Sequence, residues 1–222
     1  MGLKTTTWQS LIKARRMLIG SLLTALALIP SMGALKAQEQ ITLVAAAEQN
    51  QWKITVEADT EVWADWNGNG QKDDNELLTS GQLAEQTTAA TTLTIYGAVK
   101  KLTAPNNNIQ EVNLEQATSL IEIDLSHNNL EEIDASNCES LSVVNMSYNQ
   151  CEWPDFSSNE ELTKLDCSYN ESLSGLDIPD GLKELRCNNG ALTSLSISSL
   201  SQLTLLDCSA NPLQAIDLSQ NT

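Results

Sequence analysis

The sequence predicts a repeat solenoid preceded by a small all-β domain. A short apolar pattern recurs at nearly constant spacing over the second half of the chain, and asparagine recurs at one fixed position of that pattern. Before the pattern begins, apolar and polar residues alternate over short stretches, which is typical of β-strands. With 222 residues, the chain has room for one good-sized domain or two small ones.

Residues 1–37 have the layout of a secretory signal peptide. A basic leader precedes an apolar run of 13 residues from Met17 to Ile29, and small residues then lead to Ala37. We expect cleavage after Ala37, with Gly33 as the alternative site. The run is too short for a permanent anchor, so the mature chain is expected to have no integral membrane span. We therefore expect an extracytoplasmic protein, secreted or on the outer cell surface; the alternative is a buried apolar helix.

The charge of the mature chain limits its partners. Removal of residues 1–37 leaves 7 basic and 29 acidic side chains, a net charge of −22. Nucleic acids and anionic lipids are bound by clustered Lys and Arg, so we expect neither as a partner. The charge suits a cation or a partner with basic patches.

The residues between the signal peptide and the repeats are expected to form a small β cap domain. Residues 38–95 contain several alternating stretches, and a solenoid needs a cap over the apolar end of its first repeat. Residues Asp65 to Glu76 match the twelve-residue calcium loop D-x-[DN]-x-[DN]-G-x5-E. The expected ligands are Asp65, Asn67, Asn69, Gln71, Asp73 and Glu76. Val62 and Trp63 indicate a strand where an EF-hand has a helix, so we expect a structural calcium ion; the alternative is a polar turn without metal.

The repeats begin at Val99, and the clearest copy is Leu120-x-x-Ile123-x-Leu125-x-x-Asn128. Copies start at residues 99, 120, 141, 162, 182 and 203, so the spacings are 21, 21, 21, 20 and 21 residues. Each repeat is expected to supply one short strand, with frame positions 4 and 6 in a core shared with its neighbours. An extended segment or a single 3₁₀ turn then returns the chain along the far side. The fourth repeat is irregular, with an additional residue near Ser172 and Leu173.

The recurring asparagine is expected to close the turn after each strand and to form a ladder through the stack. Its side-chain amide can satisfy backbone groups that the turn leaves unpaired. The ladder residues are Asn107, Asn128, Asn149, Asn170 and Asn211. Gly190 is the gap in this ladder.

This frame resembles that of leucine-rich repeats. Stretches such as LIEIDLSHNNLEEID and LTLLDCSANPLQAIDLSQNT resemble the short repeats of bacterial internalin-like surface proteins. The resemblance implies a right-handed superhelix over residues 96–222, with a parallel β-sheet on its concave face. The next leading leucine would fall at position 224, so we expect an array of about six repeats that is truncated at its C-terminus.

The cysteines are expected to be structural. Cys167, Cys187 and Cys208 occupy the same inward position of successive repeats, where a small apolar side chain packs well. Cys151 lies at a second inward position, and Cys138 is the thiol with the best chance of exposure. We favour buried free thiols over disulfides or metal ligation.

The sequence favours binding over catalysis. Its single histidine, His127, lies beside the asparagine ladder, and no serine or cysteine has the context of an activated nucleophile. We expect no catalytic residues, and a protein or glycan ligand on the concave face of an adhesin or receptor. The expected contact residues are His127, Tyr148, Tyr169, Asp124, Asp166 and Arg186. The alternative is that the outward acidic residues only solvate the face; the chain would then be a structural spacer of a longer surface protein, with any catalytic domain beyond residue 222.

Overall fold

A computed structural model of the protein describes residues 38–46 and 51–221. These residues belong to one compact unit. The expected signal peptide and its cleavage site lie outside the described residues, so both stay predictions.

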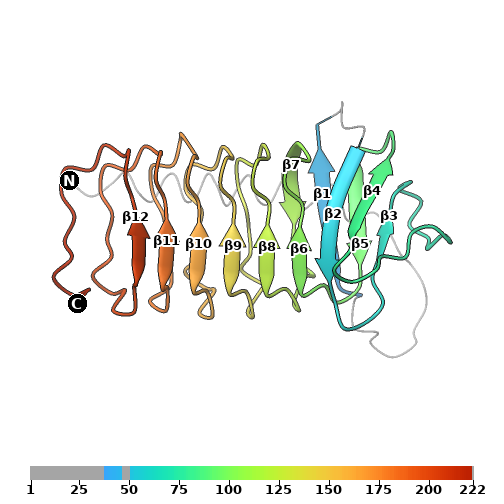
Figure 1. The fold of residues 1–222 in the computed structure, drawn as a ribbon, viewed down its shortest axis with the longest axis horizontal. Coiled ribbons are helices and arrows are strands. Elements are labelled where there is room, and N and C mark those ends of the chain that lie inside the picture. Colours follow the sequence, from blue (N-terminus) through green and yellow to red (C-terminus); the bar gives the residue numbers. More distant parts are fainter. Residues whose placement is uncertain (1–37, 47–50, 222) are drawn as a thin grey trace, which may run out of the picture. The chain divides into compact units, whose positions relative to one another are not determined.

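The second half of the chain is a β-solenoid, as the repeat spacing predicts (Figure 1). Each repeat supplies one strand of three residues to the solenoid sheet, and neighbouring strands are parallel and in register, so that Ile123 lies beside Val144 and Val144 beside Leu165. Frame position 4 is the middle residue of each strand, as predicted. The strands are β6 (Lys101–Thr103), β8 (Glu122–Asp124), β9 (Val143–Asn145), β10 (Lys164–Asp166), β11 (Glu184–Arg186) and β12 (Leu205–Asp207).

The first half contributes strands to the same sheet and to a second one. Its strands are β1 (Gln40–Ala45), β2 (Gln51–Glu57), β3 (Trp63–Asp65), β4 (Leu83–Thr87) and β5 (Thr92–Tyr96). Strand β2 pairs antiparallel with β6, so the solenoid sheet continues in the order β12-β11-β10-β9-β8-β6-β2-β4. The second sheet has the order β3-β5-β1-β7, in which β7 (Ile109–Asn113) belongs to the first repeat. Strands from both sides of the expected boundary at residue 95 therefore pair in both sheets.

The core runs through the inside of the coils and into the N-terminal strands. Leu102, Val144 and Leu165 are buried from the strand side, and Trp52 of β2 is fully buried at the other end of the same core. Burial of one such aliphatic side chain contributes about 1.5–3 kcal/mol. Each repeat completes the core of the preceding one, so these contributions depend on stacking.

The asparagine ladder is present, and each member joins two repeats. The Asn128 Oδ1 accepts hydrogen bonds from the backbone N–H groups of Asn107 and Ile109, both at 3.0 Å. Its Nδ2 donates to the carbonyl oxygens of Ala104 (3.0 Å) and Leu125 (2.9 Å). Asn149 and Asn170 also join two coils, each one coil further on, and Asn211 does so two coils after Asn170, beyond the gap at Gly190.

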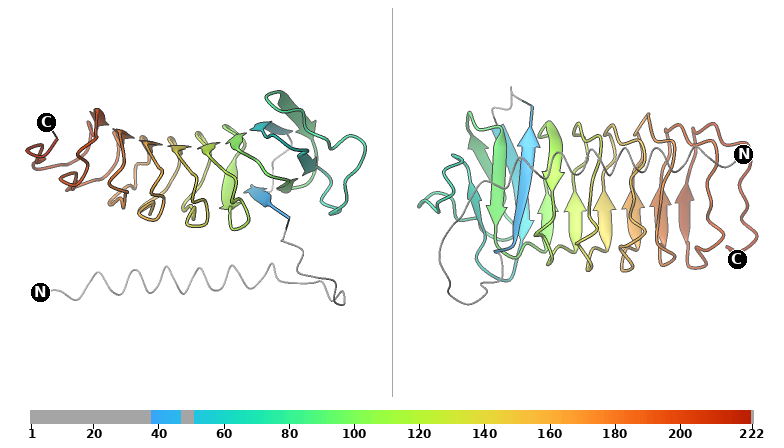
Figure 2. Two further views of the ribbon diagram at one scale, coloured as in Figure 1. Left: turned by 90° about the horizontal axis from the view of Figure 1, so that it is seen from below. Right: turned by 180° about the vertical axis from the view of Figure 1, so that it is seen from behind.

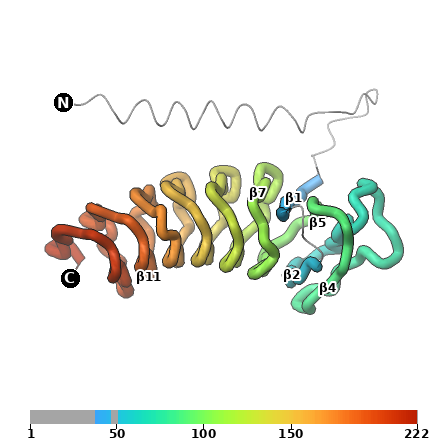
Figure 3. The backbone as a smooth tube through the Cα atoms, turned by 90° about the horizontal axis from the view of Figure 1, so that it is seen from above, coloured from blue at the N-terminus to red at the C-terminus, as the bar shows by residue number. Residues whose placement is uncertain are grey.

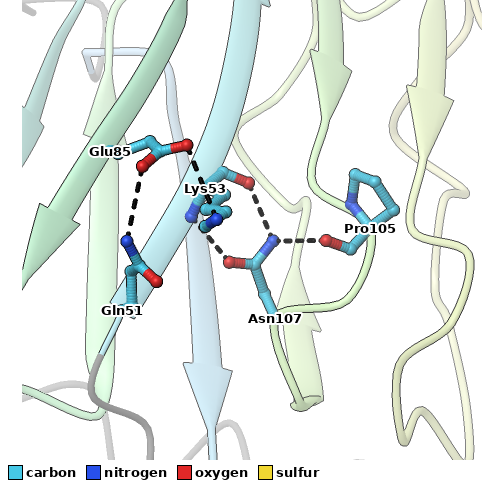
Figure 4. Close-up of polar contacts among 5 residues, drawn as sticks. All are labelled: Gln51, Lys53, Glu85, Pro105 and Asn107. Atoms are coloured by element: carbon cyan, nitrogen blue, oxygen red, sulfur yellow. Dashed lines mark hydrogen bonds and ion pairs between the residues drawn. The ribbon is translucent and has the colours of Figure 1, made fainter.

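The ladder extends beyond the repeats, which the sequence did not indicate (Figure 4). The Asn107 Oδ1 accepts the backbone N–H of Lys53 at 2.8 Å, and its Nδ2 donates to the Lys53 carbonyl at 2.9 Å and to that of Pro105 at 3.0 Å. The ladder asparagine of the first repeat therefore binds β2 in the way that the later ladder asparagines bind the repeats before them.

The return segments lie on the side of the coils away from the strands (Figures 2 and 3). Over the described residues they consist of extended stretches and turns without helix, in agreement with the expectation. We call the two sides of the solenoid the strand face and the return face.

The cysteines are free, and most are buried. Cys151, Cys167 and Cys187 are inside the core as predicted, and burial raises the pKa of Cys151 and of Cys187 to about 12. The expectation that Cys138 is exposed is wrong. Its side chain is fully buried in a tight turn, and burial raises its pKa to about 11. The half-buried thiol is that of Cys208, which lies in the last of these repeats.

Candidate functional site

Three aromatic side chains form a continuous column at one edge of the strand face. The rings of His127 and Tyr148 stack with centroids 4.1 Å apart and planes 13° apart, and those of Tyr148 and Tyr169 stack at 4.1 Å and 6°. Tyr148 and Tyr169 are 42% and 40% exposed, and His127 is exposed as well. The structure thus brings together the three aromatic residues that the sequence singled out. We call them the aromatic stack.

The backbone beneath the stack has a conformation that the sequence analysis missed. His127, Tyr148 and Tyr169 all have left-handed φ values, of 55°, 55° and 56°. Their backbone N–H groups donate to carbonyl oxygens of the next repeat at 2.8–2.9 Å, which fixes the rings one above the other. Left-handed backbone is uncommon for residues other than glycine, asparagine and aspartate. Asparagine often adopts this conformation, so Asn106 and Asn189 at the same frame position could have indicated it from the sequence.

Stacking limits what the column offers to a ligand. Both faces of the Tyr148 ring are covered, one by His127 and one by Tyr169. The exposed parts of this ring are its edge and its hydroxyl. A hydrogen bond with the Tyr169 side chain raises the pKa of Tyr148, so the Tyr148 phenol is neutral at ordinary pH.

The outward aspartates of the strands are tied to the backbone. The Asp124 Oδ1 accepts the backbone N–H of Ser126 at 2.9 Å. The Asp166 Oδ1 accepts both the N–H of Ser168 at 3.0 Å and its hydroxyl at 2.5 Å. These bonds close the turn after each strand, which is a structural role for residues predicted to contact a partner.

Further charges of the strand face lie around a shallow depression of about 260 Å³. Glu184 lies between Lys164, at 2.9 Å, and Arg186, at 3.7 Å. The hydrogen bond from Lys164 is the main cause that lowers the pKa of Glu184. Of the predicted contact residues, Asp166 and Arg186 line the depression, and Asp124 is outside its lining.

The predicted calcium loop is ordered by its own hydrogen bonds. Asp65 and Glu76 are buried, at 4% and 1% exposure. The Asp65 carboxylate accepts backbone N–H groups of Gly68 (2.7 Å), Asn69 (3.1 Å) and Gly70 (2.8 Å). The Glu76 carboxylate accepts those of Trp66 (3.0 Å) and Asp73 (2.9 Å).

The other expected ligands of this loop also contact one another. The side-chain amides of Asn67 and Asn69 donate to Asp73 Oδ2 at 2.8 and 3.0 Å, and Gln71 is exposed. Within residues 38–46 and 51–221, no three His, Cys, Asp or Glu side chains are grouped so that they could hold a metal. Carboxylate oxygens with one N–H partner retain lone pairs for a cation, so calcium binding stays a prediction.

No family model matches the chain. No curated protein matches it either. Among solved structures, the chain is similar to the functional domain of InlJ from Listeria monocytogenes, which includes a cysteine ladder, with 21% identity over 58% of this chain and a TM-score of 0.32. The chain spans 44% of the length of that structure.

No helix in the part of the chain that the structure describes is long and apolar enough to cross a membrane.

Proposed function

We propose that the protein is an extracytoplasmic binding protein of the leucine-rich-repeat type, which recognises a partner through its strand face. The aromatic stack is the observation that supports this most directly. Asn106, Asn189 and Ala210 occupy the same left-handed frame position as His127, Tyr148 and Tyr169. The fold therefore does not require an aromatic residue there, and exposed tyrosines contribute strongly to binding interfaces.

The chemistry of the stack favours a protein partner over a glycan. Sugars contact aromatic rings mainly through the ring faces, and the inner faces of the stack are covered. Ring edges and hydroxyl groups suit the mixed apolar and polar contacts of a protein surface. The salt-bridged depression over β9, β10 and β11 offers complementary charges of both signs beside them.

Binding is a better account of these residues than catalysis. Burial raises the pKa of the Cys138, Cys151 and Cys187 thiols to about 11 or 12, and a neutral thiol is a poor nucleophile. The aspartates of the strand face close turns instead of meeting a base or a metal.

The remaining predictions about the chain belong to the same proposal. Residues 1–37 act as a signal peptide, residues 38–95 cap the array of residues 96–222, and the protein is secreted or on the outer cell surface. The pairing of β2 with β6 and the bonds from Asn107 to Lys53 support the capping role. The loop from Asp65 to Glu76 binds calcium as a structural ion, supported by its two buried carboxylates.

A structural spacer is the second candidate function. The bonds from Asp124 to Ser126 and from Asp166 to Ser168 favour it, because they explain the outward aspartates without a ligand. It leaves the aromatic stack unexplained.

The test is a binding screen with a variant that keeps the backbone. The wild-type protein and the double variant Tyr148→Asn/Tyr169→Asn are compared on arrays of extracellular proteins and of glycans. Asparagine tolerates left-handed φ, so the fold should be kept. We expect at least tenfold weaker binding of the double variant to the protein partner, since each hot-spot tyrosine contributes about 2 kcal/mol or more.

The matched control is Leu77→Ala/Leu83→Ala, which removes two exposed side chains of the N-terminal half and should not change binding. Equal affinity of the wild type and the tyrosine variant for every bound protein would exclude the stack as the binding site and would favour the spacer.

A further inference from the structure

Trp153 is an exposed aromatic side chain on the return face, away from the aromatic stack. It lies between β9 and β10 in the sequence, and 55% of its surface is exposed.

The indole is held against the next repeat by two contacts. A Cβ placed on Gly175 would lie 2.4 Å from three atoms of the indole ring, so the ring rests directly on the backbone of this glycine. The indole Nε1–H donates a hydrogen bond of 2.8 Å to Asp177 Oδ2. One face of the ring is therefore covered, and the face turned away from Gly175 is open.

Gly175 has no conformational reason to be glycine, because its φ lies outside the left-handed region. The close approach of the indole explains it instead. A ring fixed in advance loses little conformational entropy when a ligand stacks on it, which favours binding.

The surroundings of the ring are strongly acidic. Carboxylates lie on the return segments of its own repeat and of the two neighbouring repeats. They are Glu131, Glu132, Glu152, Asp155 and Asp177. Glu131 and Glu132 are close enough to the core beneath to contribute, after burial, to the raised pKa of Cys151. Among the described residues, none of these five carboxylates takes part in an ion pair.

We propose that Trp153 is the centre of a second recognition surface, which binds an arginine or lysine side chain of a basic protein segment. The cation stacks on the open face of the indole, and the neighbouring carboxylates balance its charge. Tryptophan is the best aromatic partner of a cation, and arginine also stacks through its planar guanidinium. Asp155 accepts hydrogen bonds from Ser157, and Asp177 accepts one from the indole, but no basic side chain neutralises these carboxylates among the described residues. Their negative charge favours a cationic occupant over a neutral sugar. The surface is independent of the strand face and does not rest on the function proposed for it.

The experiment follows the indole N–H signals of the ¹⁵N-labelled full chain by NMR during titration with a short arginine-rich peptide. The Trp153 signal is assigned with Trp153→Phe. We expect this signal to shift saturably, with smaller shifts for the indoles of the buried Trp52 and Trp66, and the shift should weaken at high salt. The same peptide with citrulline in place of arginine should have no effect.

Two variants separate recognition by the ring from general attraction to an acidic protein. Trp153→Ala should weaken binding of the arginine peptide by about two- to fivefold, the range for an exposed cation–π contact. Gly175→Ala should have a similar effect, because its methyl group displaces the indole while the carboxylates stay in place. Tyr148→Asn, on the strand face, should leave the affinity unchanged.

Two results would overturn the proposal. Unchanged peptide affinity in both Trp153→Ala and Gly175→Ala, with far-UV circular dichroism like that of the wild type, would reduce the interaction to net charge. A Trp153 shift produced by a neutral hexose oligosaccharide and not by the arginine peptide would make the surface a glycan platform.

Discussion

The buried asparagines show how single side chains hold the repeats together. Asn149 accepts the N–H of Leu130 at 2.9 Å and donates to the carbonyls of Leu125 at 2.9 Å and of Met146 at 3.0 Å. The two ends of the amide thus contact two successive coils. Because the site is buried, loss of the amide leaves several backbone groups without partners, and each such group costs about 1–3 kcal/mol.

The first prediction concerns the position of an asparagine along this ladder. Asn149→Ala should lower the free energy of unfolding by about 3 kcal/mol or more. Asn211→Ala should cost clearly less, because part of the Asn211 site is open to water and can be rehydrated. Urea unfolding of both variants measures the difference, and equal losses would contradict a role for burial.

The buried thiols make stability depend on alkaline pH. Cys138 has a pKa of about 11, and Cys151 and Cys187 have values of about 12, against about 8.5 in an unfolded chain. Above pH 8.5 the unfolded state loses these protons and the folded state keeps them. Deprotonation therefore lowers the free energy of the unfolded state relative to the folded state. The contribution of these thiols to stability is full below pH 8.5 and falls as the pH rises above it.

The second prediction follows from this fall in stability at alkaline pH. At pH 9.5 each buried thiol should cost about 1.4 kcal/mol of stability relative to pH 7.5. Replacement of Cys138, Cys151 and Cys187 by alanine should flatten this decline, whatever it does to the stability at pH 7.5. Unfolding in a non-thiol reductant at several pH values is the measurement. Parallel pH profiles for the two proteins would refute the assignment.

At the scale of elements, the sequence predicted the strands and contacts of the repeats better than those of the segments around them. The frame placed the middle of each solenoid strand correctly, because positions 4 and 6 must enter a shared core. It also brought His127, Tyr148 and Tyr169 together, because residues one repeat apart are neighbours in register. Side-chain contacts that follow the repeat spacing were thus predictable.

Contacts that depart from this repeat spacing could not be predicted from the sequence. Gly175 lies beneath Trp153 although they are 22 residues apart, because the fourth repeat contains an additional residue. The pairing of β2 with β6 is antiparallel, so the parallel register of the repeats gives no indication of it. The burial of Cys138 depends on how its turn folds inward, and the positions of the apolar residues in the repeat frame do not predict this.

The third prediction concerns the loop from Asp65 to Glu76 as an element. Addition of 10 mM calcium to the chelator-stripped protein should raise the melting temperature by about 3–10 °C, if the affinity is in the weak range of extracellular sites. The ion would join carboxylates that now bind only backbone N–H groups. Differential scanning calorimetry with calcium, with magnesium and with chelator measures the effect.

Glu76→Gln should abolish the response to calcium, since the last loop position supplies the bidentate carboxylate. Asp74→Asn is the matched control, because Asp74 is exposed and is not a ligand position of the loop. An identical melting temperature with and without calcium in the wild type would contradict the calcium site.

At the scale of the molecule, the solenoid sheet has unequal ends. At one end β6 is covered by β2 and β4, and Trp52 and Ile54 are fully buried there. At the other end β12 has β11 as its one neighbour among the described strands, and Leu203, Leu206 and Cys208 are half-buried. In a stack whose stability comes from contacts between neighbouring repeats, such an asymmetry should produce a gradient of local stability.

The last prediction is that gradient, measured by hydrogen exchange of the 222-residue chain. Amides of β8, β9 and β10 should exchange most slowly, and those of β12 should exchange fastest among the strands of the solenoid, because opening β12 breaks contacts with one repeat and exposes little apolar surface. Trp52→Ala removes a fully buried side chain, with an expected cost of about 3–5 kcal/mol, and should speed exchange in β6 and β8 before it affects β11. Leu83→Ala, at an exposed position of β4, is the control and should change neither end. Uniform exchange rates from β6 to β12 would contradict the gradient, because the chain would then unfold as a single cooperative unit. If Trp52→Ala sped exchange first at β11, the role of β2 as the cover of the first repeat would be contradicted.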